Sequence, residues 1–274
     1  MSVINTNVSA LNAQNALKTN TRAMGTAMEQ LSTGSRINSA KDDAAGLAIG
    51  QNMTSQVRGL NQAVRNANDG INMLQTAEGA MVEMSNMLQR MRELAVQASN
   101  GTYSTTQRTY LNKEFSALSS QITSINTQTK WNGMSGLATT TAISRQFQVG
   151  ANATDTVSVT LSGTDLTTLT INASTLSGAD NTGASAAISA LDIALGKVNA
   201  QRAGIGAAVN RLTYAADNLT NISSNVSASR SSIMDTDYAT ASTQLSKSQI
   251  IQQAATAMLA QANQQPQSVL ALLK

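Results

Sequence analysis

The stretch from Ile188 to Ile233, ISALDIALGKVNAQRAGIGAAVNRLTYAADNLTNISSNVSASRSSI, carries an almost unbroken apolar row. The row is formed by Ile188, Leu191, Leu195, Val198, Ile205, Val209, Leu212, Ala216, Leu219, Val226 and Ile233. Steps of three, four or seven residues keep these side chains on one stripe of a helix for about 68 Å, at about 1.5 Å per residue. The stripe is narrower than the apolar face of a globular core helix. It predicts a rod of long helices packed side by side, and therefore a structural role.

The composition favours close helix packing and excludes several kinds of function. Only 3% of the 274 residues are aromatic and 12% are charged, and much of the apolar material is small. The net charge is +3, but Lys and Arg are scattered, which argues against nucleic-acid binding.

The chain has neither Cys nor His, so disulfides, Cys or His zinc sites, a Ser-His-Asp triad and a Cys nucleophile are excluded. Asp42 and Asp43 are adjacent, and adjacent helical side chains diverge, so a helix-start role is favoured over a catalytic pair. We expect no enzyme activity, no metal and no cofactor.

Neither a signal sequence nor a membrane span is expected. The first residues, MSVINTNVSAL, lack the basic and apolar regions of a secretory signal, and the chain has no 18 consecutive apolar residues. We therefore expect a soluble chain with no membrane partner. If it leaves the cell, it should do so by a route that does not use a cleaved N-terminal signal.

Three helices are predicted in the first half of the chain. Apolar residues at seven-residue intervals predict a helix that begins almost at residue 1 and ends near Gly34. Ser39, with Asp42 three positions later, resembles an N-cap, so a second helix should start near residue 40. This helix should end near Asn100-Gly101. A third helix over about residues 106–128 follows a short connection and should form an antiparallel hairpin with the second.

Shorter elements are predicted in the middle of the chain. Short strands in hairpins are expected where apolar residues alternate, in the pieces Phe147/Val149, Val157/Val159/Leu161 and Leu169/Ile171. The small, polar segment 174–185 is expected to be an exposed tip or linker. The long helix should then run to about Ile233, followed by a last helix with apolar residues Ile251, Ala255, Met258 and Ala262.

Both ends of the chain carry apolar stripes, whereas chain termini are normally polar and frayed. Neither stripe holds enough apolar area to fold alone. We therefore predict that the terminal helices pair with each other and with copies from neighbouring subunits, which couples folding of the ends to assembly. The residues expected to carry self-assembly are Val3, Leu11, Leu17, Met24, Leu31, Ile251, Met258, Val269, Leu270 and Leu273.

Distinctive motifs lie near both ends of the chain. On the N-terminal side they are LSTGSRINSAKDDAAG over residues 31–46, RNANDG over residues 65–70 and QRMRELAVQ over residues 89–97. On the C-terminal side they are QRAG over residues 201–204, DTDYA over residues 235–239 and QANQQP over residues 261–266. These motifs resemble those of bacterial flagellin, the subunit of the flagellar filament. Gly204-Ile205-Gly206 and Ala241 depart from the family's usual residues, which affects local contacts and not the assignment.

The stripes and the resemblance agree on a mainly α fold. They predict a long antiparallel helical rod, a coiled-coil-like bundle, with a small β-hairpin region and terminal helices that pair in the assembled filament. The resemblance divides the chain into five segments. These are an N-terminal inner-tube helix (1–40), rod-domain helices and hairpin (41–130), a short β-rich variable region (131–182), a long rod helix (183–234) and a C-terminal inner-tube helix (235–274).

The resemblance implies a structural subunit that self-assembles into the extracellular flagellar filament used for swimming. It further implies export by the flagellar secretion apparatus with an export chaperone, and contacts with filament cap and junction proteins. A hook–filament junction or adaptor protein of related fold is the alternative. By resemblance, Gln89, Arg90, Leu94 and Glu114 match positions that contact the vertebrate Toll-like receptor for flagellin. In the simpler interpretation, Arg90 and Glu114 are solvated charges paired across the hairpin.

Overall fold

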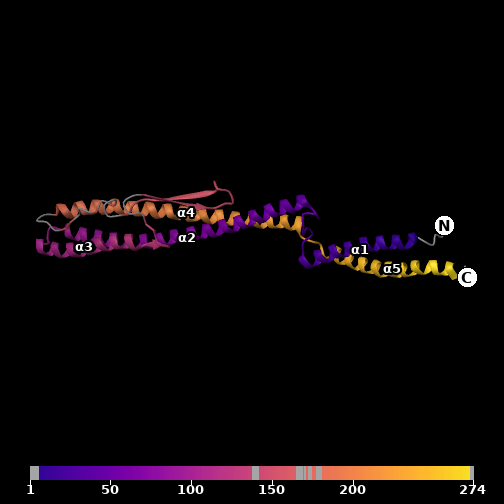
Figure 1. Ribbon diagram of the computed structural model, residues 1–274. Coiled ribbons are helices and arrows are strands. Elements are labelled where there is room, and N and C mark those ends of the chain that lie inside the picture. The colour runs from indigo at the N-terminus through magenta and orange to yellow at the C-terminus, as the bar shows by residue number, and fades with distance from the viewer. Residues whose placement is uncertain are drawn as a thin grey trace. The chain divides into compact units, whose positions relative to one another are not determined.

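The computed structural model describes residues 6–137, 142–164, 169, 171, 175–176 and 181–271, with side chains as far as residue 264. Its elements are α1 (Val8–Thr33), α2 (Ala44–Ala98), α3 (Thr105–Gln128), β1 (Lys130–Trp131), β2 (Met134–Ser135), β3 (Ile143–Gln148), β4 (Thr156–Leu161), α4 (Thr182–Met234) and α5 (Tyr238–Ala271) (Figure 1). The chain divides into two compact units, which are residues 58–224 and residues 1–57 with 225–274. The fold is mainly α with small β-hairpins, as the sequence predicts.

The unit of residues 58–224 is a helical bundle in which α2 and α4 run antiparallel (Figure 1). Polar contacts between the two helices pair residues from opposite ends: Asn61 with Ser223, Glu78 with Arg202, and Arg92 with Asp192. Helix α3 follows α2 after a short connection, and the predicted hairpin of these two helices is confirmed.

The core of this bundle is built from the predicted stripe. On α4, Leu191, Val198, Ile205 and Leu212 have no exposed surface. On α2, the facing core side chains are Met81, Met84, Leu88, Met91 and Leu94. Full burial of one such side chain contributes roughly 1.5–3 kcal/mol, so a regular row of them stabilises helices that would be marginal in isolation.

The β3–β4 hairpin packs on α2 in this unit. Residues of β3 pair antiparallel with β4, from Ile143 with Leu161 to Gln148 with Thr156. Phe147 lies against Gly70, where an added Cβ would come within 2.8 Å of the Phe147 ring. The close approach of strand and helix therefore requires a residue without a side chain at position 70.

Two expectations for the middle of the chain are corrected. Leu169 and Ile171 are buried, but neither lies in a strand. In the segment expected to be an exposed tip, Leu176 is 1% exposed and α4 already begins at Thr182. Residues 174 and 177–180 of that segment lie outside the described residues.

In the other unit, α1 packs along α5 (Figure 1). Helix α1 begins at Val8 and not near residue 1, because the Asn7 side chain caps it by accepting a hydrogen bond from the Ala10 N–H. It ends at Gly34, whose φ of 71° lets its N–H reach the carbonyl oxygen of Gln30.

Helix α2 begins at Ala44, four residues later than predicted, because the two aspartates differ in role. The Asp42 carboxylate accepts hydrogen bonds from Ser39 and from the Asn38 N–H, so it closes a turn before the helix. The bond from the Ser39 hydroxyl is the main cause that lowers the pKa of Asp42. Asp43 then caps the helix by accepting from the Gly46 N–H at 2.8 Å.

The α1–α2 and α4–α5 connections are joined by a backbone clasp, which we define as residues 34–36 with residues 233–236. Ser35 and Asp235 form an antiparallel β-bridge, and the Thr236 N–H donates to the Gly34 carbonyl oxygen at 3.0 Å. The Arg36 N–H and guanidinium donate to the carbonyl oxygens of Met234 and Ile233, at 2.7 and 2.6 Å. Arg36 therefore satisfies carbonyl groups at the end of α4 that have no partner within the helix.

Candidate functional site

The first candidate site is the outer surface of the α1–α5 pair. Ala10 and Ala27 of α1 and Ala241 of α5 are buried, but many larger apolar side chains on these helices are not. The exposed ones are Val8 (54%), Leu11 (56%), Met28 (56%), Ile250 (67%), Ile251 (40%) and Met258 (65%). A chain that leaves so many apolar side chains in water on one helix pair presents a surface suited to association.

The predicted self-assembly residues fall into three groups. Leu11, Ile251 and Met258 are exposed, whereas Leu17, Met24 and Leu31 are half-buried in the unit that holds the α1–α5 pair. Val3 and Leu273 lie outside the described residues, as do the side chains of Val269 and Leu270. Val8, Met28 and Ile250 are also exposed, although they are not among the predicted self-assembly residues; Val8 and Met28 broaden the seven-residue stripe of α1.

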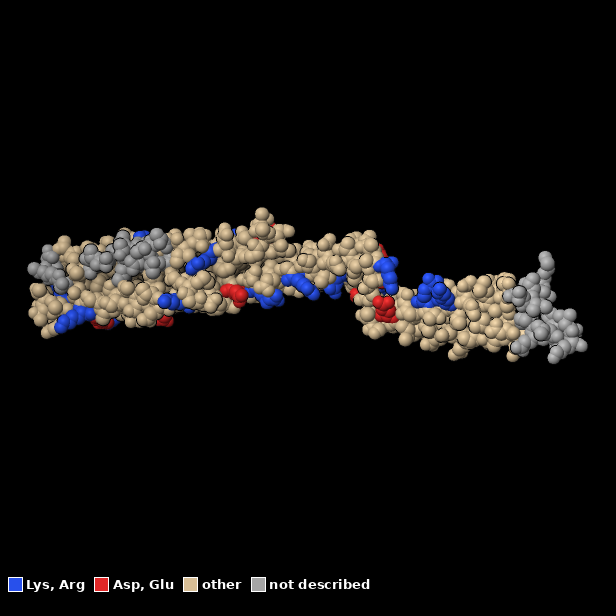
Figure 2. All heavy atoms as spheres, viewed as in Figure 1, with Lys and Arg blue, Asp and Glu red and all other residues tan. Residues whose placement is uncertain are grey.

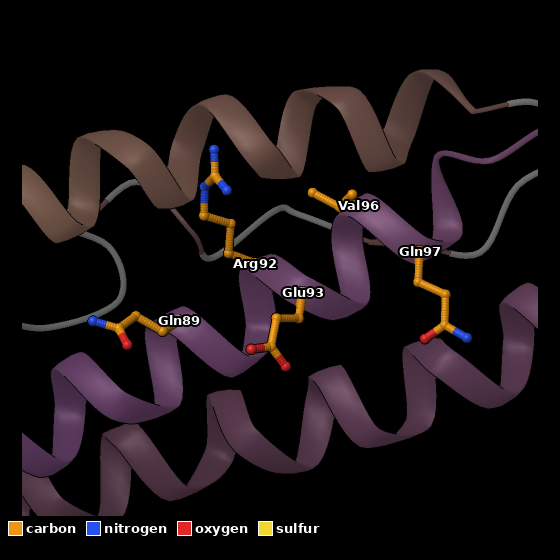
Figure 3. A pocket seen from close by; sticks show the side chains of 5 residues that line it. All are labelled: Gln89, Arg92, Glu93, Val96 and Gln97. Carbon is orange, nitrogen blue, oxygen red and sulfur yellow. The ribbon is translucent and has the colours of Figure 1, made fainter.

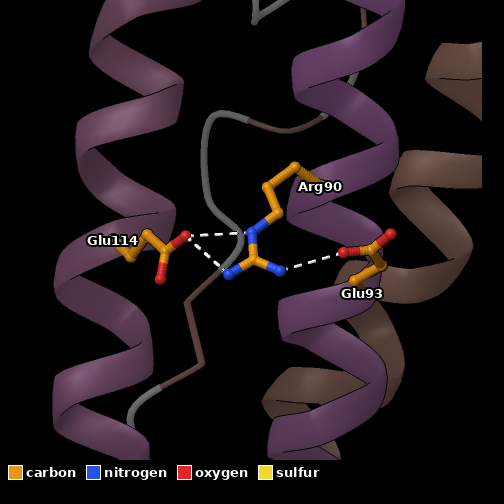
Figure 4. Close-up of polar contacts among 3 residues, drawn as sticks. All are labelled: Arg90, Glu93 and Glu114. Atoms are coloured by element: carbon orange, nitrogen blue, oxygen red, sulfur yellow. Dashed lines mark hydrogen bonds and ion pairs between the residues drawn. The ribbon is translucent and has the colours of Figure 1, made fainter.

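The second candidate site is a charged cluster between α2 and α3 (Figure 4). Arg90 points from α2 between two carboxylates, with its Nε 3.0 Å from Glu114 Oε1 and its Nη1 2.9 Å from Glu93 Oε2. About half of the Arg90 and Glu114 side chains remains accessible (51% and 46%). The hydrogen bonds that Arg90 donates to Glu93 and then to Glu114 raise the pKa of its guanidinium. The pairing across the helix hairpin is thus confirmed.

A shallow groove of about 490 Å³ lies on α2 beside this cluster, lined by Gln89, Arg92, Glu93, Val96 and Gln97 (Figure 3). Arg92 is held by Asp192 of α4 at 2.7 Å, and this hydrogen bond raises the pKa of Arg92. Half of Val96 is exposed. The groove places an apolar side chain among paired charges and two amides, of which Gln97 donates a hydrogen bond to the Tyr103 hydroxyl at 3.0 Å.

The four predicted receptor residues do not form one surface. Gln89, Arg90 and Glu114 are exposed, but Leu94 is 1% exposed and belongs to the bundle core. The sequence contains the signal for this difference, because Leu94 follows Met91 by three residues and continues the buried stripe of α2. A ligand that binds the intact bundle can therefore touch three of the four.

Among the described residues, no group of three or more acidic residues is placed to hold a metal ion. Within the same part of the chain, no helix combines the length and apolarity needed to cross a bilayer. On the face seen in Figure 2, basic side chains occur at many points along the helices, with acidic ones at several points among them.

The bundle and the apolar surface of the terminal helices define a helical structural protein built to associate. Two regions of the chain match known families of proteins. Residues 4–142 match the bacterial flagellin N-terminal helical region, and residues 188–273 match the bacterial flagellin C-terminal helical region. The chain therefore belongs to the bacterial flagellin family.

Relatives match over nearly their full length. A flagellin of Halalkalibacterium halodurans is 44% identical, with 99% of this chain and 100% of the relative covered. A flagellin of Bacillus subtilis is 41% identical, with 99% of both chains covered. The flagellar filament 33 kDa core protein of Treponema phagedenis is 40% identical, with 99% of this chain and 100% of the relative covered. The crystal structure of Bacillus cereus flagellin is 35% identical and gives a TM-score of 0.49, covering 57% of this chain and 88% of that one.

Proposed function

We propose that this chain is the structural subunit of a bacterial flagellar filament and that it polymerises through α1 and α5. The observation that supports this most directly is the set of large apolar side chains left exposed on these two helices, exemplified by Leu11, Ile250 and Met258. Contacts between unlike surfaces of identical subunits generate a helical assembly when the rotation from copy to copy does not close a ring. Burial of these side chains against neighbouring copies supplies the driving force.

The position of each segment in the filament is part of the proposal. Segments 1–40 and 235–274 form the inner layer, whereas segments 41–130 and 183–234 form the outer layer, and segment 131–182 is the variable region. The subunit is secreted by the flagellar export apparatus with a chaperone and is added beneath a cap, beyond the junction proteins. Membership of a structural protein family supports a non-enzymatic role.

Electron microscopy of the purified chain at high salt tests the proposal. We expect long filaments of uniform width, because salt strengthens apolar association and screens the net charge of +3. A hook–filament junction protein, the alternative considered above, would give short rings or no polymer. Absence of filaments over a range of salt and protein concentrations would contradict the proposal.

We also propose that the cluster of Arg90, Glu93 and Glu114 is recognised by the Toll-like receptor for flagellin. Its support is the match of Gln89, Arg90 and Glu114 to the family's receptor positions and their exposure on adjoining helices. We expect the double change Arg90→Ala with Glu114→Ala to weaken binding of the monomer to the receptor ectodomain at least tenfold. Surface plasmon resonance with immobilised ectodomain measures this.

The matched control for this experiment is Arg65→Ala. Arg65 is also an exposed arginine on α2, its side chain bonds only to Gln62 among the described contacts, and it lies about 37 Å along the helix from Arg90. The control should bind as the natural chain does. Equal affinity of the double variant and the natural chain would refute receptor recognition by this cluster.

A further inference from the structure

We propose that Met28 and Met258 are oxidation-sensitive sites of the unassembled subunit, and that a peroxide converts them to sulfoxides that block assembly. The chain has 12 Met and no Cys, so its thioethers are the only sulfur atoms that an oxidant can reach. The effect on assembly rests on the proposed function, whereas the sites of oxidation do not.

Burial divides the methionines of the described residues into groups that differ in access. Met81, Met84 and Met91 have no exposed surface and belong to the core of the bundle. More than half of Met28 and of Met258 is exposed. An oxidant dissolved in water has to reach the sulfur, so oxidation follows exposure. The core thioethers should react only when the bundle opens, which makes the terminal helices the sensitive part of the chain.

Helices α1 and α5 run antiparallel (Figure 1). The Asn7 side chain, just before α1, donates to the carbonyl oxygen of Ala262 at 2.7 Å. Further along α1, the Asn20 side chain donates to the carbonyl oxygen of Ser248 at 2.7 Å. Each step forward on α1 therefore corresponds to a step backward on α5, and these contacts show which residues lie at the same level.

Met258 lies within the apolar surface that the terminal helices leave exposed. It precedes Ala262 by four residues, and Leu11 follows Asn7 by four residues, so the two side chains lie at the same level of the pair. Both are exposed, as is Val8 on the same helix as Leu11. Oxidation of Met258 therefore places a polar group in the middle of an apolar patch.

The reaction is a two-electron oxygen transfer. A lone pair of the thioether sulfur attacks one oxygen of hydrogen peroxide, the O–O bond breaks, and the other oxygen leaves as water after a proton shift. The sulfur is oxidised and the peroxide is reduced, so no further reagent is needed. The product is a polar, chiral sulfoxide in place of a flexible, apolar side chain.

A sulfoxide on this surface opposes assembly and leaves the folded subunit intact. In the monomer its oxygen accepts hydrogen bonds from water. Packing against the apolar side chains of a neighbouring copy removes that water, and an apolar side chain donates no hydrogen bond in return. We expect oxidation to raise at least tenfold the protein concentration at which filaments form. In the filament, the same contacts should shield both thioethers from peroxide.

Peptide mapping by mass spectrometry after brief treatment with hydrogen peroxide locates the reactive sites. In the monomer, Met28 and Met258 should form sulfoxide at least tenfold faster than Met81 and Met84. Met134, which is 44% exposed on β2, should also react, because it too is open to water. In the polymer, the oxidation of Met28 and Met258 should slow at least tenfold.

Leucine substitutions separate the effect of the two sites from general damage. Met28→Leu with Met258→Leu keeps similar apolar volume and removes both thioethers, so assembly followed by electron microscopy should survive peroxide treatment. Met134→Leu is the matched control, because Met134 is exposed on the bundle and not on the terminal helices. This control should lose assembly as the natural chain does. Circular dichroism of the oxidised natural chain should show an unchanged unfolding transition of the bundle.

Three results would overturn the inference. Oxidation of Met81 or Met84 as fast as Met28 would refute the assignment of the sites. Normal assembly of a natural chain oxidised at both sites would refute the effect on assembly, as would a double leucine variant that remains sensitive to peroxide. An untreated chain that forms no filaments refutes the proposed function and the effect on assembly with it, but the order of oxidation still decides which sites react.

Discussion

We expect deletion of residues 235–274 to abolish filament formation under conditions that polymerise the full chain. The deletion removes α5, and with it the exposed Ile250, Ile251 and Met258 and the partner of α1. Helix α1 then loses the helix that it packs along, and a single amphipathic helix is marginal in water. Electron microscopy at high salt should show no filaments.

The bundle of residues 58–224 should survive this deletion. Its core of α2, α3 and α4 side chains, which includes Leu88, Phe115 and Leu191, lies wholly within this unit. Thermal unfolding followed by circular dichroism should therefore retain the main transition of the full chain, with a lower helical signal in the native state. Filaments of normal width from the truncated chain would refute assembly through α5.

The second large effect is expected in the core of the bundle. Leu191→Ala removes a side chain with no exposed surface from the α4 stripe, near the start of the helix. Loss of its buried methyl groups and the cavity that remains should lower the free energy of unfolding by about 2–5 kcal/mol. Urea unfolding should show a lower midpoint with an unchanged slope.

The control for this variant lies two residues away. Ile193→Ala removes a side chain of similar size from the same helix, but 53% of Ile193 is exposed. We expect its free energy of unfolding to change by less than about 1 kcal/mol, because surface substitutions have small effects. Equal destabilisation by the two variants would mean that the stripe does not form the core of the bundle.

Long-range periodicity made the helices predictable. The row that runs from Ile188 to Ile233 predicts a helix that ends near Ile233, and α4 ends at Met234. A stripe repeated over so many turns leaves little freedom in which face is buried. Local signals at the helix starts were less informative. Ser39 and Asp42 resemble a cap, yet Asp43 caps α2, because the same short polar side chains also close turns.

The candidate sites show where sequence reasoning reached its limit. Resemblance transferred Leu94 to a receptor surface, although its own spacing from Met91 places it in the core. Conversely, no spacing rule could pair Asn20 with Ser248, because that contact depends on the alignment of two helices from opposite ends of the chain. Contacts between distant segments require the tertiary structure, whereas the buried face of one helix does not.

Arg36 has a consequence for the bend between α4 and α5. The residues of the bend, Asp235, Thr236 and Asp237, include neither glycine nor proline, so their local preferences do not force a helix to stop there. A contact with a distant segment and a local cap lie there instead. The guanidinium and the backbone N–H of Arg36 occupy the carbonyl oxygens of Ile233 and Met234, although Arg36 precedes Ile233 by 197 positions. Asp237 then caps α5 by accepting a hydrogen bond from the Ala239 N–H at 3.0 Å. The corner between two helices is thus held by hydrogen bonds from the opposite end of the chain as well as by its own residues.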